Sequence, residues 1–311
     1  MNEARRTPAP AALVAAFYRF VPLPDYRALR GPLQQRCADL GLLGTILLAR
    51  EGINGTVSGP EPAVGQLMAW LRDDTRFADL GFKLSWAREA PFYRMKVRLK
   101  KEIVSLGVPG VDPLRAAGEY VNPEAWNELI ARPEVRVIDT RNDYEVHLGS
   151  FEGAESPETR SFRDFPAWAK RHLDPERDRH VAMYCTGGIR CEKATAFLKA
   201  HGFQHVYHLE GGILNYLESV AEAASAWRGD CFVFDNRVTV DHALREGDFD
   251  VCPACRMPLS EKDRHSPKFE LHVSCPKCCD RLTPEKRQGL LERARQIELA
   301  VVRGEKHLGS R

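Results

Sequence analysis

The 311-residue chain carries 45 Lys and Arg against 43 Asp and Glu, so its formal net charge of +2 indicates no particular charged partner. Hydrophobic residues make up 43% and charged residues 28%, which is typical of a soluble globular protein, and the length predicts two or three domains. No apolar run approaches the roughly 20 residues of a membrane-spanning helix, and PAALVAAFYRF near the start is also too short. Arg19 and the VPLPDY that follows fit a strand and a turn better than a secretory signal. Without an export signal, the nine cysteines favour metal binding and catalysis over disulfides, and we expect a cytoplasmic protein without membrane contact.

Residues 1–105 predict a ferredoxin-like α+β domain. The sequence reads as a strand at 14–21, a helix at 26–41, two short strands within 44–59, a helix at 61–74 and a last strand at 81–87. The pair Asn54-Gly55 is a strong tight-turn signal, so we expect the turn between the two short strands there. The order βαββαβ is that of a ferredoxin-like sandwich, and no residue in this part forms a catalytic pattern.

A basic strand is predicted after this domain, at 93–101. In YRMKVRLKK every second residue is a cation, and apolar residues lie between the cations. Because the side chains of a strand alternate between its faces, one face should carry Arg94, Lys96, Arg98 and Lys100. This face is either a solvated outer surface or a rail that holds the phosphates of a nucleic acid without reading its sequence.

Residues 118–228 predict an α/β domain with a mostly parallel sheet, because short apolar strands alternate with helices. Asn122 and Pro123 begin a helix that extends to residue 130. Strands are expected at 135–139, 180–185 and within 203–212, and helices at 192–202 and 213–227.

Cys185 ends one of these strands, and the next helix begins near Cys191. Two glycines in the connecting loop let the backbone curl so that successive N–H groups form a concave anion site, to which the helix start and Arg190 add positive charge. These features favour a thiolate and predict a depressed pKa at Cys185 rather than an inert buried cysteine. The loop residues are Thr186, Gly187, Gly188, Ile189 and Arg190.

The spacing of the loop separates two chemistries. Four residues lie between Cys185 and Arg190, one fewer than in a cysteine phosphatase loop, whose arginine grips phosphate with two hydrogen bonds. The shorter loop suits an atom held on sulfur better than a whole phosphate group.

This loop resembles that of the rhodanese domains. VIDTRNDYEVHLGSFEGA (137–154) is similar to the rhodanese segment in which a strand-end Asp-x-Arg precedes a Glu and a glycine turn, and HLEGGILNYL (208–217) is similar to the region near the end of that domain. Asp139 and Arg141 either order the site through an ion pair or are purely structural.

The pieces GTILLAREGINGTVSG, YCTGGIRCEKA and VYHLEGGILNYLE, in this order, resemble the oxygen-dependent tRNA uridine hydroxylase family over nearly the whole chain. Members of this family carry a ferredoxin-like domain, a rhodanese domain and a cysteine-containing C-terminal segment. The resemblance implies that the anticodon region of tRNA is the partner, that O2 is the co-substrate and that wobble uridine 34 becomes 5-hydroxyuridine. It matches Cys185 and Cys191 to the two cysteines of the family's loop. No flavin, haem or non-haem iron motif is recognisable.

Two chemistries are open for a thiolate at Cys185. It could add to C6 of uracil and make C5 nucleophilic toward an oxygen donor, or it could carry a persulfide or an oxidised sulfur. Cys191, about one helical turn away, is either a thiol that resolves these species through a disulfide or a packed residue at the helix start.

Residues 229–284 are rich in cysteine. Cys252, Cys255, Cys275 and Cys278 form two C-x2-C pairs with nineteen residues between them, which predicts a structural zinc site; a pair of redox motifs is the alternative. Further candidate ligands are Cys279, His265 and His272. Residues 285–311 predict an amphipathic helix that is packed on the rest of the chain or frayed.

The preferred functional interpretation is a tRNA-modifying hydroxylase. A rhodanese-type sulfurtransferase that moves sulfane sulfur to a thiol or tRNA acceptor would use the same loop residues and is the alternative. A third possibility is an RNA- or protein-binding scaffold with a degenerate rhodanese domain. The presence of Cys185 argues against it, since inactive rhodanese domains usually lack this cysteine. The additional domains favour the first interpretation, because a simple sulfurtransferase needs neither a basic strand nor a zinc segment.

Overall fold

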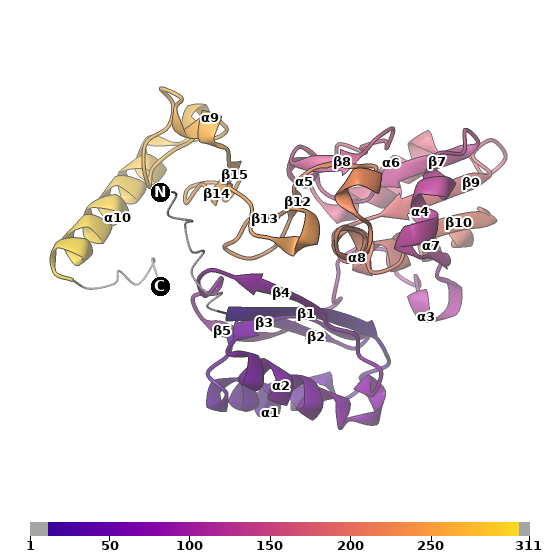
Figure 1. Cartoon of the computed structure of the whole chain (residues 1–311), viewed down its shortest axis with the longest axis horizontal. Helices are drawn as coiled ribbons and strands as arrows, with labels where there is room; N and C mark the ends of the chain where they lie inside the picture. The colour runs from indigo at the N-terminus through magenta and orange to yellow at the C-terminus, as the bar shows by residue number, and fades with distance from the viewer. Residues whose placement is uncertain (1–11, 305–311) are drawn as a thin grey trace, which may run out of the picture.

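A computed structural model describes residues 12–304 of the chain, which forms two sheet-containing regions and a smaller C-terminal region (Figure 1). The outer ends of the predicted first domain and tail, residues 1–11 and 305–311, lie outside the described residues. Within 12–304 no helix combines the length and apolar character needed to cross a membrane.

The first region is a five-stranded sheet in the order β4-β1-β3-β2-β5. The first four strands pair antiparallel as in a ferredoxin-like sandwich, and β5 joins the edge of the sheet parallel to β2. The predicted basic strand is therefore part of this sheet. The elements are β1 (Ala12–Phe20), α1 (Tyr26–Asp39), β2 (Leu43–Ala49), β3 (Gly52–Gly59), α2 (Glu61–Arg72), β4 (Lys83–Ala87) and β5 (Met95–Leu99).

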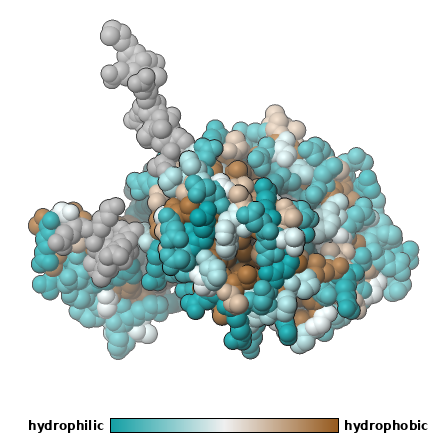
Figure 2. All heavy atoms as spheres, turned by 90° about the horizontal axis from the view of Figure 1, so that it is seen from below, coloured by the Kyte–Doolittle hydropathy of each residue, from teal (hydrophilic) through white to brown (hydrophobic). Residues whose placement is uncertain are grey.

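The two faces of this sheet have different roles. One face packs on α1 and α2 through an apolar core that includes Phe17, Ile46 and Val57. The outer surface of this helical layer is mostly hydrophilic with scattered hydrophobic residues (Figure 2). The opposite face lies toward the second region (Figure 1), and its side chains belong to the alternate residues of each strand.

The prediction of a turn at Asn54-Gly55 is wrong. The chain turns at Arg50 and Glu51, and Asn54 and Gly55 lie inside β3. Gly52 makes the early return possible: its φ is +145°, and a Cβ there would lie 2.0 Å from the carbonyl oxygen of Arg19. The Asn54 side chain instead donates to the carbonyl oxygen of Ile103, 3.0 Å away. The pairing of β3 with β1 and β2 therefore outweighs the local turn preference of Asn54-Gly55.

The second region confirms the predicted parallel sheet, in the order β6-β10-β9-β7. Asn122 caps α4 by accepting from the Ala125 N–H at 2.8 Å. The helix expected at 213–227 is shorter, because the chain leaves the helix at Ser219 and Trp227 starts β11, which pairs with β8. The elements are α3 (Pro113–Ala116), β6 (Glu119–Val121), α4 (Pro123–Ile130), β7 (Val135–Asp139), α5 (Asp143–Val146), β8 (Gly149–Phe151), α6 (Phe165–His172), β9 (His180–Tyr184), α7 (Ile189–Ala200), β10 (His205–Leu209), α8 (Gly212–Ser219) and β11 (Trp227–Gly229).

The C-terminal region is built from two-stranded ribbons and two helices. Its first part still belongs to the second region's core, since Cys231, Val240 and Leu244 pack in the same apolar cluster as Tyr184. The last helix shows little packing, because Ala300 is its one buried residue. The elements are β12 (Cys231–Phe232), β13 (Thr239–Val240), β14 (Asp250–Val251), β15 (Pro258–Leu259), α9 (Glu261–Arg264) and α10 (Pro284–Val302).

Candidate active site and metal centre

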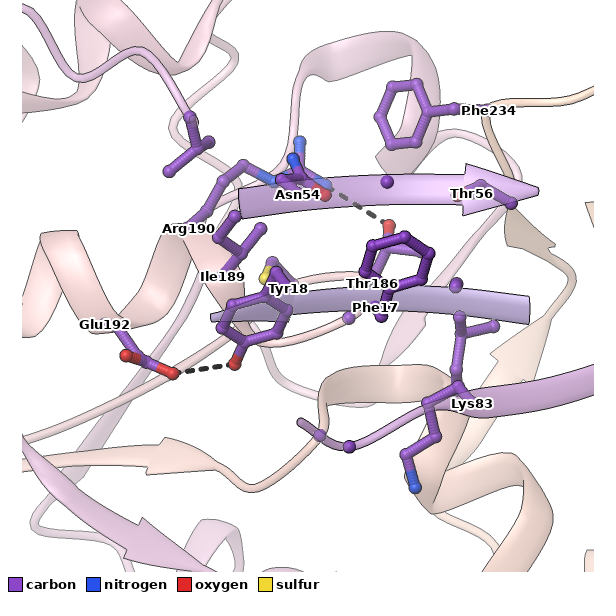
Figure 3. A pocket seen from close by; sticks show the side chains of 18 of the residues that line it. Phe17, Tyr18, Asn54, Thr56, Lys83, Thr186, Ile189, Arg190, Glu192 and Phe234 are labelled. Carbon is purple, nitrogen blue, oxygen red and sulfur yellow. Dashed lines mark hydrogen bonds between the residues drawn. The ribbon is translucent and has the colours of Figure 1, made fainter. Parts of the chain in front are cut away.

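A cleft of about 1300 Å³ lies between the open face of the first sheet and the cysteine loop of the second region (Figure 3). Its walls come from the two regions, with Tyr18 and Asn54 on one side and Thr186 and Arg190 on the other. Phe234, from the segment after β12, is 60% exposed at the same cleft. The cleft is larger than a typical pocket for one small ligand.

Cys185 is at the floor of this cleft, with none of its surface exposed to water. It follows β9 directly, and α7 begins at Ile189, so the loop is as short as the sequence predicted. Burial alone would raise the pKa of the Cys185 thiol, but a hydrogen bond from Cys191, the charge of Arg190 and the backbone N–H groups of both residues lower this pKa to about 6. The Gly188 N–H also donates to the sulfur at 3.1 Å. Cys185 is therefore a thiolate at neutral pH.

Two glycines make this geometry possible. Gly188 has a φ of +96°, and a Cβ there would lie 2.8 Å from the hydroxyl of Tyr18. Gly212 has a φ of +66°, and a Cβ there would lie 2.4 Å from the carbonyl oxygen of Cys185. A side chain at either position would strain the backbone and push the loop away from its neighbours.

Cys191 lies behind the loop, fully buried, where its sulfur contacts the Thr140 hydroxyl at 3.5 Å. Burial, the hydrogen bond to Cys185 and the negative charge on Cys185 raise the pKa of Cys191 well above its ordinary value. Cys191 is therefore a protonated thiol that donates to Cys185. This contact places it where a disulfide with Cys185 could form.

Arg190 does not point a free guanidinium into the cleft. It makes two hydrogen bonds of 2.7 Å to the carboxylate of Glu145, which is on α5, and both side chains are buried. The Thr186 hydroxyl lies 3.2 Å from each partner. Arg190 thus acts on the thiolate through its charge while Glu145 fixes its position.

Asp139 and Arg141 form a second buried ion pair behind this one, with an Nη2–Oδ2 distance of 2.6 Å. Arg141 also donates to the backbone carbonyls of Glu145 and Gly149, at 3.3 and 2.6 Å. The two pairs therefore form one connected network that positions the loop from below. Neither Asp139 nor Arg141 lines the cleft.

Sequence reasoning missed the residues that join the two regions at the cleft. The Tyr18 hydroxyl, on β1, donates to Glu192 on α7 at 2.7 Å (Figure 3). One residue further along α7, the buried Lys193 pairs with Glu51 at 2.8 Å and Glu102 at 2.7 Å, both from the first region. These partners are far apart in the sequence, and no local motif links them.

Two family models match the chain. Residues 12–103 match the UPF0176 acylphosphatase-like domain, and residues 122–219 match the rhodanese-like domain. The chain has the domain architecture of the tRNA uridine hydroxylase family. The sheet with β1–β5 is its UPF0176 domain, and the parallel sheet with the cysteine loop is its rhodanese domain.

Solved rhodanese-like structures are similar to part of the chain. The rhodanese-like domain of an Anabaena protein is 20% identical, with 35% of this chain and 78% of that one covered and a TM-score of 0.30. A Thermoplasma volcanium rhodanese-related protein is 22% identical, with 32% and 91% covered and a TM-score of 0.26. A Staphylococcus aureus rhodanese-like protein is 21% identical, with 32% and 90% covered and a TM-score of 0.27.

The basic strand continues the cleft-facing surface of the UPF0176 domain. In β5, Lys96 pairs with Thr45 and Arg98 with Leu47, and both partners line the cleft. Paired residues share a face, so these two cations project on the same side of the sheet as the cleft. Arg94 and Lys100, both exposed, have the same alternation just outside the strand, and none of the four cations lines the cleft itself.

The four cysteines of the two C-x2-C pairs converge on one point, with all sulfurs within 4.8 Å of one another. The Cys252–Cys278, Cys255–Cys275 and Cys275–Cys278 sulfur distances are 3.9, 3.7 and 3.7 Å. A zinc tetrahedron with Zn–S bonds of about 2.3 Å has edges of about 3.8 Å, so this donor set fits such an ion. Cys279, His265 and His272 are not part of the cluster.

Proposed function

We propose that this protein hydroxylates C5 of the wobble uridine of tRNA in a reaction that consumes O2. The observation that carries the proposal is the position of Cys185: a thiolate at the floor of a large cleft whose opposite wall is a sheet face that continues into cations. A tRNA substrate also implies that the protein acts in the cytoplasm.

The size and walls of the cleft support a macromolecular substrate. A small sulfur donor would need only the rhodanese loop, whereas the cleft also takes in the open face of the UPF0176 sheet and the exposed ring of Phe234. Enzymes that act on a base in a nucleic acid place the base in a pocket and stack it against aromatic side chains. Lys96 and Arg98 lie where the sheet face leaves the cleft and would hold the neighbouring phosphates.

The chemistry that suits this site begins with addition of the Cys185 thiolate to C6 of the uracil ring. The electron pair of the C5–C6 double bond then moves toward C5 and O4, which makes C5 a nucleophile for oxygen. If O2 supplies the oxygen atom, the second atom leaves as water and takes two electrons from a reductant. Because the sulfur has no exposed surface, lining side chains must shift when the ring binds.

The alternative function, transfer of sulfane sulfur, is favoured by the match to the rhodanese-like domain. In that reaction Cys185 would carry a persulfide. Because the pKa of the Cys185 thiol is about 6, the thiolate would be equally available to attack a sulfur donor. The two functions differ in their product on tRNA, which is oxidised at C5 in one case and thiolated in the other.

We further propose that the four-cysteine cluster holds structural zinc. With Cys252, Cys255, Cys275 and Cys278 as its ligands, the ion would have no open position for water or substrate. The ion would stabilise the fold of the C-terminal region. Three of the four buried residues in the apolar cluster of this region are ligand cysteines, so little other apolar packing holds it together.

Nucleoside mass spectrometry of tRNA tests the proposal. Purified protein, unmodified tRNA and a reductant should give 5-hydroxyuridine at the wobble position under air and none under argon, and Cys185→Ala should give none under either gas. A 2-thiouridine product formed with a sulfane donor and without oxygen would establish the sulfurtransferase instead.

A further inference from the structure

The cleft is lined by three carboxylates with different surroundings: Glu192, Glu210 and Asp235. Asp235 is neutralised by Arg237, with an Nη2–Oδ2 distance of 2.6 Å, and Glu210 is exposed. Glu192 accepts hydrogen bonds from the hydroxyls of Tyr18 and Tyr120, and no ion pair of Glu192 occurs among residues 12–304. A carboxylate held at a cleft without a cation retains its full basicity.

Glu192 is held in place by the two domains. Its carboxylate accepts the 2.7 Å hydrogen bond from Tyr18 of the UPF0176 domain, and its backbone is fixed in the first turn of α7, directly after Cys191. In Figure 3 the labelled side chains of Tyr18 and Glu192 meet at the edge of the cleft. The carboxylate therefore sits at a fixed point beside the cysteine loop.

The environment of Glu192 makes it a stronger base than an ordinary glutamate. Burial and the negative charge on Cys185 raise the pKa of Glu192, against the lowering effect of hydrogen bonds from Tyr18 and Tyr120. Contacts on the cysteine loop place this carboxylate near the sulfur: the Tyr18 hydroxyl that it binds would lie 2.8 Å from a Cβ at Gly188, and the Gly188 N–H donates to the Cys185 sulfur at 3.1 Å. A ring bonded to that sulfur through C6 would bring its neighbouring atom, C5, within reach of the carboxylate.

We propose that Glu192 is the catalytic base that removes the C5 proton from the oxygenated uridine, with Tyr18 as its positioning residue. This inference rests on the proposed hydroxylase function. After oxygen has been transferred, C5 carries both a hydroxyl and a hydrogen, and C6 is bonded to the Cys185 sulfur. The aromatic-like ring of the product cannot form until this hydrogen leaves.

The step is an elimination that needs no oxidant. The Glu192 carboxylate takes the C5 proton, and the C5–H electron pair becomes the C5–C6 double bond. The C6–S bond breaks, and its electron pair leaves on Cys185 as the thiolate. Glu192 then returns the proton to water in the cleft, so carboxylate and thiolate are both restored for the next substrate.

The test uses Glu192→Gln, which keeps the size of the side chain and removes the base. We expect hydroxylation to fall by about a hundredfold or more. A covalent complex between the protein and tRNA should accumulate on denaturing gels and be absent from the double variant Glu192→Gln, Cys185→Ala. With deuterium at C5 of the wobble uridine, the isotope effect on product formation should rise relative to the wild type. Glu192→Asp should recover part of the rate.

Controls separate this role from a structural one. Glu128→Gln removes an exposed carboxylate on α4, outside the cleft, and should keep the wild-type rate. Tyr18→Phe should lower kcat by about tenfold while KM changes little. The variant loses the hydrogen bond that positions the Glu192 carboxylate but keeps the aromatic ring of residue 18 in the cleft.

Three results would overturn or remove the inference, and they are distinguishable. Wild-type activity in Glu192→Gln contradicts it, and so does a slow variant with no covalent complex and an unchanged isotope effect, which would reveal a purely structural role. If the wild-type protein makes no 5-hydroxyuridine, the proposed function fails and this inference fails with it.

Discussion

Arg190 and Glu145 are joined by two hydrogen bonds of 2.7 Å, and neither side chain has more than 7% of its surface exposed. Arg190 belongs to the cysteine loop and Glu145 to α5, so this pair fixes the loop to the rest of the rhodanese domain. Burial and the charge of Arg190 act in opposite directions on Glu145, and the pKa of this carboxyl is lowered.

Glu145→Gln should lower the free energy of unfolding by about 3–5 kcal/mol, because it leaves the Arg190 charge buried without a counterion. Denaturant unfolding measures this loss. The matched control is Glu152→Gln, which breaks an exposed pair with Arg228 and should cost less than about 1 kcal/mol. Replacing both buried partners together, as Glu145→Leu with Arg190→Met, should restore much of the stability. Equal losses in the buried and exposed single variants would contradict the role assigned to the pair.

Iodoacetamide reaches the buried Cys185 sulfur only when the side chains that cover it move apart, so alkylation should be slow. Its rate should follow a titration curve with a midpoint near pH 6, since the pKa of this thiol is about 6. Below the midpoint the thiol is protonated and unreactive, and above it the rate levels off. Mass spectrometry of peptides reports the rate at each cysteine. Cys231 provides an internal control, because burial raises its pKa to about 12. A midpoint for Cys185 near the ordinary value of about 8.5 would show that the loop does not stabilise the thiolate.

Metal analysis of the purified protein should give one zinc ion per chain. Cys255→Ser removes one ligand of the cluster and should release the zinc, whereas Cys279→Ser, next to the cluster but outside it, should retain the ion. Hydrogen exchange should show that the loss of metal opens residues 250–283 while β1–β5 and β9 stay protected. Zinc retained by Cys255→Ser, or lost equally from Cys279→Ser, would rule out this ligand set.

Lys193→Met should loosen the contact between the UPF0176 and rhodanese domains, because Glu51 and Glu102 would then repel each other without the shared cation. We expect a loss of about 2–4 kcal/mol at neutral pH. Burial raises and Lys193 lowers the pKa of Glu102, and the net shift is downward. The Lys193–Glu102 ion pair therefore contributes its full stabilisation above the ordinary glutamate pKa of about 4.3. This stabilisation is lost as the pH falls through the lowered pKa of Glu102.

The measurement for Lys193→Met is urea unfolding at neutral pH and at a pH below the lowered pKa. The difference between the variant and the wild type should shrink in acid. Lys199→Met, on the exposed side of the same helix, is the control and should cost little at either pH. A difference that is independent of pH would show that the variant loses mainly the hydrogen bond from Lys193 to the carbonyl oxygen of Val104, and not the ion pairs.

The double charge reversal Lys96→Glu, Arg98→Glu should weaken tRNA binding by about tenfold or more at physiological salt. It should also reduce the slope of log affinity against log salt concentration by about 1–2, since two phosphate contacts are lost. Filter binding at several salt concentrations gives both quantities. Arg27→Glu, an exposed cation on α1 behind the sheet, should leave the slope unchanged. Equal effects of the two variants would mean that binding depends on overall charge alone.

The parts of the fold that follow from short segments were predictable. The alternation of YRMKVRLKK, the buried strand before Cys185 and the spacing of the C-x2-C pairs each have a local physical cause, and the structure contains the corresponding strand, loop and cluster. The signal at Asn54-Gly55 was equally local but misleading, because the pairing of β3 with two neighbours decided where the turn falls.

The contacts that complete the site could not be read from the sequence. The charge of Arg190 was predictable, but its neutralisation depends on Glu145, 45 residues earlier in the chain. The bond between Tyr18 and Glu192 joins residues 174 positions apart, in separate domains. Neither pair follows a periodicity or spacing rule, because folding of the rhodanese domain brings Arg190 to Glu145 and docking of the two domains brings Tyr18 to Glu192.

The concealment of the Cys185 sulfur has a consequence for a protein that handles oxygen. A thiolate is the form of cysteine that peroxide converts to sulfenic and then to irreversibly oxidised acids, and its susceptibility depends on how freely it is reached. With no surface open to water, the sulfur is shielded while the cleft is empty. Damage to this cysteine should therefore be slow in the resting protein and fastest during turnover, when an arriving base opens the way to the sulfur.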